Sequence, residues 1–464
     1  MSQSSKDGTT FSTSQGARHA TQDIQRTTCA SQGTQALGPA PAWVQDSIWQ
    51  RYIRGLHYLS IAPSILEVCA GAGTASIALK LLLGPDKMRV AGAWDTDPEL
   101  SGIHDVINGE DAHTVHLGQQ AGDILTTELT TFPSANILVA GPPCPPFSSC
   151  GKRMALEDSR SQPFKRCVDI LEELDTRARP VEGAQGHHDE LMFFLLENVM
   201  GINFVSHFNQ PTALETLLDE LRGRLGSTWL VQFVKANAWN YGLPQNRPRI
   251  YIVGRKTKFY TEYIPRGPQH FERRVRAARL LDKLDNKAPS LTTLQEQCLK
   301  QWKRHYRTSM SNTAYLGKVA FVEGGRDPSG RTVWASTTST NPPHTDKCQC
   351  LRASGPMMHV FALGEGSGLL SLDRLLRVRE RASLQGFPDI IGQLPFTERV
   401  GQRVFGNAMS VPVVGSLMAV ELLAIQASWD AAASRAKCNA SPTPCSSGHE
   451  TRGGQPGPRT HGAY

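Results

Sequence analysis

The chain of 464 residues is long enough for two or three domains with a sizeable hydrophobic core, and its 39% hydrophobic and 20% charged residues are typical of globular proteins. The net charge of +7 is modest, and ten cysteines without a repeated spacing favour a reducing compartment over a disulfide framework. We find neither the roughly 18 consecutive apolar residues of a membrane span nor an apolar signal core. We therefore expect an intracellular protein with no membrane partner.

Both ends of the chain are predicted to be disordered tails. Residues 1–45 are rich in Ser, Thr, Gln and Gly, and residues 429–464 in Ala, Ser, Pro and Gly, so neither is expected to bury enough apolar surface to fold. The N-terminal tail is poor in acidic residues, which is also typical of organellar transit peptides. A plain tail is the preferred interpretation, and import into an organelle is the alternative.

Residues 50–255 are predicted to form one α/β domain. Short apolar runs typical of buried strands alternate with helical segments such as residues 75–83. We expect strands at residues 65–68, 90–93, 137–140, 192–196, 230–234 and 249–253. This order predicts a mostly parallel sheet with helices on both faces. Such sheets bind ligands at the carboxyl ends of their strands.

The alternation stops after residue 255, and residues 256–372 are predicted to form a smaller, irregular domain. Its segment 266–307 holds eleven Lys and Arg against four Asp and Glu, an excess equal to the +7 of the whole chain. This block indicates a polyanionic partner, and a solvated helix surface is the alternative. We expect no metal site, because a group in this region matches no common zinc spacing: His344, Cys348, Cys350 and His359.

Residues 373–428 form the last predicted section before the C-terminal tail. A short helix is expected at residues 374–389 and a turn at Gly406-Asn407. Apolar residues at helical spacing then predict a helix at residues 411–425. We expect this last helix to pack on the first domain.

A cysteine follows the strand predicted at residues 137–140. The strand runs into Gly141-Pro142-Pro143, a turn that cannot continue it, so Cys144 is presented at the carboxyl edge of the sheet. Prolines on both sides stiffen the backbone around this side chain. The arrangement suits a nucleophile, although a small buried thiol is the commoner explanation for a single cysteine.

A second set of residues indicates a nucleoside-containing ligand. The glycine turn Ala70-Gly71-Ala72-Gly73 follows the first strand, Asp95 ends the second, and Asp123 lies further along. A carboxylate at a strand end can accept hydrogen bonds from ribose hydroxyls. The turn lacks the third glycine of a dinucleotide fingerprint and a phosphate-loop lysine, so S-adenosylmethionine fits better than a dinucleotide or ATP. Glycine turns and strand-end aspartates also occur in α/β domains with other functions.

Glu197 lies at the end of another apolar strand, where its burial is costly without a partner or a task. It is expected at the same sheet edge as Cys144. A thiolate and a protonatable carboxyl group are the pair needed to add a nucleophile to an electron-poor ring. Arg247 and Arg249 precede the last strand, where they can orient the carboxylate, lower the thiol pKa or bind phosphate. A surface turn is the alternative for these two arginines.

Together these motifs resemble those of the cytosine-5 DNA methyltransferase family over residues 50 to 425. They occur in the order that the family shows: Ala70-Gly71-Ala72-Gly73, Asp95, Asp123, Pro142-Pro143-Cys144 with Phe147-Ser148, Glu197-Asn198-Val199, Gln245-Asn246-Arg247-Pro248-Arg249, Arg379-Glu380 with Leu384-Gln385-Gly386-Phe387-Pro388, and Gly406-Asn407-Ala408-Met409-Ser410-Val411-Pro412. The resemblance implies a Rossmann-like S-adenosylmethionine-dependent methyltransferase fold, with a target-recognition domain at residues 256–372.

The resemblance also implies methyl transfer from S-adenosylmethionine to carbon 5 of cytosine in DNA. Cys144 would attack carbon 6 of a flipped-out base while Glu197 engages ring nitrogen 3 and the exocyclic amine. Arg247 and Arg249 would support the base and the catalytic loop, and the basic domain would contact phosphates. The donor would be bound by Ala70, Gly71, Gly73, Asp95, Asp123 and Asn407. We expect a monomer, in the nucleus if the source is eukaryotic.

The chain departs from the family's usual residues at several motif positions: Cys69, Thr74, Asp95, Pro145 and Arg377. None of these departures removes a group that makes or breaks bonds. Two alternatives stay open. One is a tRNA cytosine-5 methyltransferase, although the Cys-Phe-Thr tripeptide of its eukaryotic branch is absent from this sequence. The other is a catalytically idle DNA-binding relative, which would typically lack Cys144 or Glu197.

Overall fold

The computed structural model describes nine stretches of the chain and four single positions, 293, 296, 297 and 300. The stretches are residues 37–109, 114–143, 161–177, 190–204, 211–281, 318–323, 346–354, 357–363 and 374–440. Cys144, Pro145, Phe147 and Ser148 lie outside the described residues, as do residues 1–36 and 441–464 of the predicted tails.

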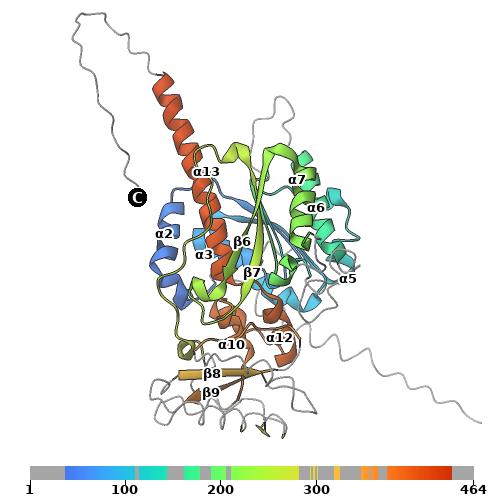
Figure 1. Ribbon diagram of the computed structural model, residues 1–464, viewed down its shortest axis with the longest axis vertical. Helices are drawn as coiled ribbons and strands as arrows, with labels where there is room; N and C mark the ends of the chain where they lie inside the picture. Colours follow the sequence, from blue (N-terminus) through green and yellow to red (C-terminus); the bar gives the residue numbers. More distant parts are fainter. Residues whose placement is uncertain are drawn as a thin grey trace, which may run out of the picture.

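A seven-stranded sheet forms the centre of the molecule, in the order β3-β2-β1-β4-β5-β7-β6 (Figure 1). The four pairings from β3 to β5 are parallel, whereas β7 is antiparallel to both β5 and β6. The strands are β1 Ser64–Val68, β2 Arg89–Asp95, β3 Val115–Leu117, β4 Ile137–Ala140, β5 Phe193–Val199, β6 Trp229–Asn237 and β7 Pro248–Lys256. The predicted α/β class with a mostly parallel sheet is confirmed.

Helices cover both faces of this sheet, as predicted (Figure 1). In β4, Ile137 and Val139 join the core shared with α2, α3 and α13, whereas Leu138 and Ala140 join the core shared with α6 and α7. Successive side chains of a strand point to opposite faces, so an unbroken apolar run serves both layers. The helices are α2 Ser47–Leu56, α3 Thr74–Leu83, α4 Ser101–Asn108, α5 Gly118–Ala121, α6 Gln162–Arg177, α7 Ala213–Leu225 and α13 Val411–Ala440.

A second, three-stranded sheet has the order β10-β9-β8, and its strands β8 and β9 lie at the bottom of Figure 1, below α10 and α12. Its strands are antiparallel: β8 Lys318–Glu323, β9 Met358–Leu363 and β10 Arg374–Leu375. Three helices follow it, α10 Val378–Leu384, α11 Asp389–Gly392 and α12 Glu398–Asn407. Short 3-10 helices connect the larger elements: η1 Ala42–Gln45, η2 Pro85–Lys87, η3 Pro98–Leu100, η5 Leu129–Thr131, η8 Met200–Asn203, η9 Gly226–Thr228, η10 Ala238–Tyr241, η11 Thr257–Phe259 and η12 Ala277–Arg279.

The sequence predicts one helix at residues 374–389, but the structure has a strand followed by a shorter helix there. Arg374–Leu375 is a strand, and the helix begins at Val378. The strand forms because Arg374 and Leu375 pair with β9, a partner that is remote in sequence. The helix ends before Gly386, whose φ of +87° is the left-handed conformation typical of helix ends.

Each of the two predicted tails includes residues that form regular structure. Trp43, inside the predicted tail 1–45, is 3% exposed, stacks edge-on against Trp49 and donates a hydrogen bond from Nε1 to the Gly386 carbonyl at 3.1 Å. At the other end α13 continues through Trp429 to Ala440. Its last turns are rich in alanine, which propagates a helix that has already formed.

Helix α13 is the longest helix in the described part of the chain, and it packs on α2 and α3. Gly415 makes the approach possible, because a side chain there would collide with the Trp49 ring. Contrary to the sequence expectation, the helical stretch Glu398–Cys438 is long and apolar enough to cross a membrane by length and composition. However, 89% of its most apolar window is buried inside the structure, and core helices of folded proteins pass the same test.

A buried ion pair joins α13 to the central sheet. Arg255 on β7 donates to both carboxylate oxygens of Glu421 on α13, each at 2.7 Å, and their side chains are 2% and 0% exposed. Removing one partner leaves the other charge buried and uncompensated. We expect Arg255→Met or Glu421→Met to lower the free energy of unfolding by about 3–5 kcal/mol, measured by urea titration.

The double variant Arg255→Met/Glu421→Met tests whether the cost comes from an unpaired charge. It leaves neither charge in the core, so its stability should exceed that of at least one single variant. A strictly additive loss in the double variant would contradict this explanation.

Candidate active site

Four parallel strands bring the predicted site residues to one edge of the sheet. The carboxyl ends of β1, β2, β4 and β5 lead into the turn at 69–73, Asp95, the turn at 141–143 and Glu197. Strand β7 runs the opposite way, so its first residues lie at the same edge, and Arg249 is in register with Val199. The antiparallel pairing of β7 therefore places the arginine motif beside the carboxyl end of β5.

The glycine turn after β1 adopts left-handed backbone conformations. The φ angles are +50° at Cys69, +52° at Gly71 and +63° at Gly73. Ala70 is buried, and its amide donates to the Trp94 carbonyl at 2.9 Å. A Cβ added at Gly71 would have no atom within 4 Å, so open space lies beside this residue. The turn thus offers the half-buried backbone of Gly71 next to the end of β2.

Asp95 is tied to this turn through its carboxylate. The Gly71 amide donates to Asp95 Oδ2 at 2.8 Å, and the Asp97 amide donates to Oδ1 at 2.9 Å. Burial raises the pKa of Asp95, and the two amide hydrogen bonds offset only part of that rise. The carboxylate is therefore held rigidly at the strand end, with lone pairs left over for a ligand.

Two further predicted donor-site residues lie on neighbouring segments. Asp123 follows Gly122, which packs so closely on the Asp95 carbonyl that no side chain fits there. The Asp123 Oδ1 atom accepts the Leu125 amide at 2.9 Å. Asn407, the last residue of α12, is exposed. It lies one turn after Arg403, whose guanidinium pairs with Asp97 at 3.0 Å, so this face of α12 borders the end of β2.

Two buried side chains that the sequence analysis missed support the donor turn. Glu67 accepts the Ala75 and Ser76 amides at 3.2 and 2.8 Å, which caps the start of α3. His104 lies 3.0 Å from the Gly71 carbonyl through Nε2. Burial lowers the pKa of His104 to about 4, so the neutral ring donates this hydrogen bond from Nε2. No local motif marks either residue.

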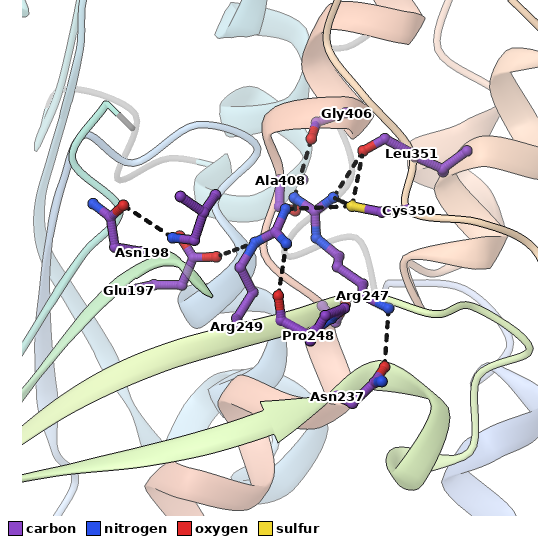
Figure 2. Close-up of polar contacts among 12 residues, drawn as sticks. Glu197, Asn198, Asn237, Arg247, Pro248, Arg249, Cys350, Leu351, Gly406 and Ala408 are labelled. Carbon is purple, nitrogen blue, oxygen red and sulfur yellow. Dashed lines mark hydrogen bonds and ion pairs between the residues drawn. The ribbon is translucent and has the colours of Figure 1, made fainter. Parts of the chain in front are cut away.

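Glu197 and Arg249 form an ion pair at the end of β5 (Figure 2). Arg249 Nε lies 2.9 Å from Glu197 Oε1, and both side chains are largely buried. The other oxygen, Oε2, lies 4.0 Å from the position that a Cβ at Gly141 would take. The Asn198 amide group donates to the Pro142 carbonyl at 3.4 Å. Glu197 therefore borders the turn that precedes Cys144, although Cys144 itself lies outside the described residues.

Arg247 has a different set of partners from Arg249. It is 3% exposed, and its guanidinium donates to the carbonyls of Leu351, Gly406 and Ala408 at 2.8–3.0 Å. These carbonyls belong to two segments more than 100 positions away. Arg247 thus joins residues 346–354 and the α12–α13 turn to β7, and only Arg249 of the two contacts Glu197 in the described part of the chain.

The remaining motif residues form a buried polar network behind the arginines. Gln245 is fully buried, its Nε2 donates to the Leu384 carbonyl at 2.8 Å, and its Oε1 accepts the Leu351 amide at 3.1 Å. Gln385 accepts hydrogen bonds from Gln245 and from the Ser410 hydroxyl. Side chains that read as separate motifs in the sequence therefore hold one another in place.

A family model settles the class of the protein. Residues 64–420 match the model of the C-5 cytosine-specific DNA methylase. The chain belongs to this family. The match includes all seven strands of the central sheet, the glycine turn, Glu197 and the arginine pair. The protein is therefore identified as a DNA cytosine-5 methyltransferase.

Individual relatives of this cytosine-specific DNA methylase include bacterial enzymes. This chain is 29% identical over 292 residues to the Type II methyltransferase M.NgoBI of Neisseria gonorrhoeae. The match covers 62% of this chain and 75% of that protein. It is 26% identical over 361 residues to the Type II methyltransferase M.HpaII of Haemophilus parainfluenzae. This match covers 75% of this chain and 86% of that protein.

Solved structures with similarity to this DNA methylase include the S. pombe Dnmt2 methyltransferase and the Entamoeba histolytica methyltransferase EhMeth. The first has a TM-score of 0.46 at 18% identity, covering 78% of this chain and 98% of that one. The second has a TM-score of 0.48 at 14% identity, covering 78% and 97%.

Proposed function

We propose that this methylase transfers a methyl group from S-adenosylmethionine to carbon 5 of a flipped-out cytosine in DNA, through a covalent adduct with Cys144. The observation that carries the proposal is the Glu197–Arg249 pair, placed beside the turn that precedes Cys144 and at the same sheet edge as Asp95. A carboxyl group, a nucleophile site and a nucleoside-binding turn thus converge on one edge.

The donor turn fits S-adenosylmethionine by shape and charge. Gly71 borders open space, and the Asp95 carboxylate beside it can accept hydrogen bonds from two ribose hydroxyls. When bound there, S-adenosylmethionine would supply the methyl group for carbon 5. Asp123 and Asn407 lie on the segments that flank Asp95 and would close the adenosine site.

The base would be activated from two sides. The Cys144 thiolate would form a bond to carbon 6, and the electron pair of the carbon 5–carbon 6 double bond would move to carbon 5. Glu197 in its protonated form, oriented by Arg249, would donate its proton to ring nitrogen 3 and accept a hydrogen bond from the exocyclic amine, which neutralises the negative charge that develops on the ring. After methylation, loss of the proton from carbon 5 and of the sulfur from carbon 6 restores the double bond.

Positive charge on the second part of the chain supports DNA as the substrate. Five arginines between residues 266 and 279 are exposed to solvent: Arg266, Arg273, Arg274, Arg276 and Arg279. The Arg274 guanidinium lies 4.0 Å from the centre of the Trp239 ring, and the Lys347 ammonium lies 4.5 Å from it. Such exposed cations neutralise phosphates along a nucleic-acid backbone.

The test is methyl transfer by the purified protein from labelled S-adenosylmethionine to duplex DNA or to tRNA, in parallel. Label that appears in DNA and is located on carbon 5 of cytosine by nucleoside analysis supports the proposal. Label in tRNA alone would assign the protein to RNA. Label in neither would identify it as an idle relative.

Asp95 provides a test of the donor site. We expect Asp95→Ala to weaken S-adenosylmethionine binding at least tenfold, because it removes charged acceptors for the ribose and frees Gly71. Isothermal titration calorimetry measures the effect, with exposed Asp105→Ala on α4 as the matched control. Because burial raises the pKa of Asp95, affinity should fall on acidification at a higher pH than for an ordinary aspartate. Unchanged affinity in Asp95→Ala would remove Asp95 from the donor site.

A further inference from the structure

Cys350 lies between the two arginines of the active site (Figure 2). Its Sγ atom is 3.4 Å from Arg247 Nη1 and 3.5 Å from Arg249 Nη2, so both guanidiniums donate to the same sulfur, which also lies 3.5 Å from the Leu351 carbonyl. Cys350 follows the short bridge between Gln245 and Cys348, which fixes this segment of the second domain against the start of β7. The contact is therefore built by the fold and does not depend on a mobile side chain.

The charges around this sulfur do not balance if the thiol is neutral. Arg247 is buried and Arg249 largely buried, and in the described part of the chain the carboxylate of Glu197 contacts Arg249 alone. The other partners of Arg247 there are carbonyls, the Asn237 side chain and Cys350. A buried charge without an opposite charge is costly, and a Cys350 thiolate would make the cluster neutral.

The electrostatics of the cluster favour this ionised form. Burial acts to raise the pKa of Cys350, but the charges and hydrogen bonds of Arg247 and Arg249 outweigh it and leave the pKa lowered. The contact with Cys350 also affects the pKa of Arg249. Burial acts to lower the pKa of Arg249, but the negative charges of Cys350 and Glu197 raise it overall.

Each nitrogen of the Arg249 guanidinium has a partner in the described part of the chain. Nε contacts Glu197 at 2.9 Å, Nη1 donates to the Pro248 carbonyl at 2.8 Å, and Nη2 donates to Cys350. Cys350 thus holds the end of the guanidinium opposite to Glu197. Without it, Nη2 loses its anionic partner, and the guanidinium can turn away from the carboxylate that it orients.

We propose that Cys350 is a positioning residue for methyl transfer, and that its thiolate holds Arg249 against Glu197. This role rests on the proposed function of Glu197. It differs from the role of Cys144, because the Cys350 sulfur accepts hydrogen bonds from the two arginines and takes no part in the covalent chemistry.

Two substitutions of Cys350 test whether its negative charge or its size is needed for methyl transfer. Cys350→Ser keeps a small polar side chain but removes the negative charge, so we expect kcat to fall about tenfold while the KM for S-adenosylmethionine stays unchanged. Cys350→Asp restores a negative charge and should recover part of kcat. The matched control is Cys438→Ser on the exposed part of α13, which should behave as the unsubstituted protein. An unchanged kcat in Cys350→Ser, or no recovery in Cys350→Asp, would overturn the positioning role.

The ionisation of Cys350 is tested independently of catalysis. The full-length protein is alkylated with iodoacetamide across a pH series, and the Cys350 and Cys438 peptides are quantified by mass spectrometry. Among the described residues, the charged groups that act on Cys350 are Arg247 and Arg249, with Glu197 and Tyr251 next to these arginines, so the thiol should react at lower pH than that of Cys438. Arg249→Gln should move its profile upward.

The outcomes distinguish this inference from the proposed function. A Cys350 peptide that reacts only at the pH where Cys438 reacts, or at no pH, would overturn the thiolate. A lowered profile with no methyl transfer by the unsubstituted protein would instead overturn the proposed function, and the positioning role with it. A lowered profile together with the loss in Cys350→Ser and recovery in Cys350→Asp supports the inference.

Discussion

Replacing Cys144 with serine is expected to abolish methyl transfer to DNA while S-adenosylmethionine still binds. A thiolate is the nucleophile that the proposed attack on carbon 6 requires, and a hydroxyl at the same position is neutral at physiological pH and much less reactive. The rate should fall by at least about 10³-fold, to the limit of detection. Single-turnover transfer of labelled methyl groups measures the loss, and calorimetry with S-adenosylmethionine shows that the donor site is intact.

Trapping on a modified substrate tests the covalent step directly. DNA that carries 5-fluorocytosine cannot lose the substituent on carbon 5, so the adduct through carbon 6 should accumulate and migrate as a protein–DNA complex in a denaturing gel. Cys144→Ser should form no such complex. If trapping survived in this variant, the nucleophile would be another cysteine, with Cys150 the first to examine.

Glu197→Gln is expected to reduce kcat by roughly 10²–10⁴-fold with little change in S-adenosylmethionine affinity. Glutamine can still contact the base, but it is neither an anion that pairs with Arg249 nor an acid that protonates ring nitrogen 3. The measurement is the single-turnover rate on duplex DNA at saturating donor. The circular dichroism spectrum should be unchanged, because the site lies at the edge of the sheet and the core beneath it is untouched.

Glu173→Gln is the matched control for this substitution. Glu173 lies on α6, where it pairs with Arg177 one turn along the helix at 2.8 Å, and its side chain is 30% exposed. It should retain the full rate. A loss in Glu173→Gln comparable with that in Glu197→Gln would show that the effect is a general response to the exchange of a carboxylate for an amide.

Much of the fold could be predicted because most strands of its central sheet, such as β1 and β4, are buried on both faces. Such strands appear in the sequence as unbroken apolar runs, and the structure has a strand at each of the six predicted places. Strand β3 was missed because it is only three residues long and half-exposed, so it lacks that pattern. The helical end of α13 was missed because composition alone does not distinguish an alanine-rich helix from an alanine-rich tail.

The ends of strands could also be read from the sequence. Asp95, Glu197 and the turn before Cys144 each follow an apolar run, and parallel strands carry such positions to one edge. The arginine motif reaches that edge for another reason, because β7 is antiparallel and begins there. The direction of β7 could not be read from its apolar residues, since parallel and antiparallel strands share the same spacing.

The sequence by itself determined the class of fold, the family motifs and the chemical types present in the site. Local patterns suffice for these, because periodicity and turn residues act over a few positions. Only the tertiary structure showed that Arg247 and Arg249 have different partners and that Cys350 contacts both arginines. These contacts join residues more than 100 positions apart, and their distances depend on how the segment 346–354 packs against the start of β7. No short-range pattern in the chain encodes that packing.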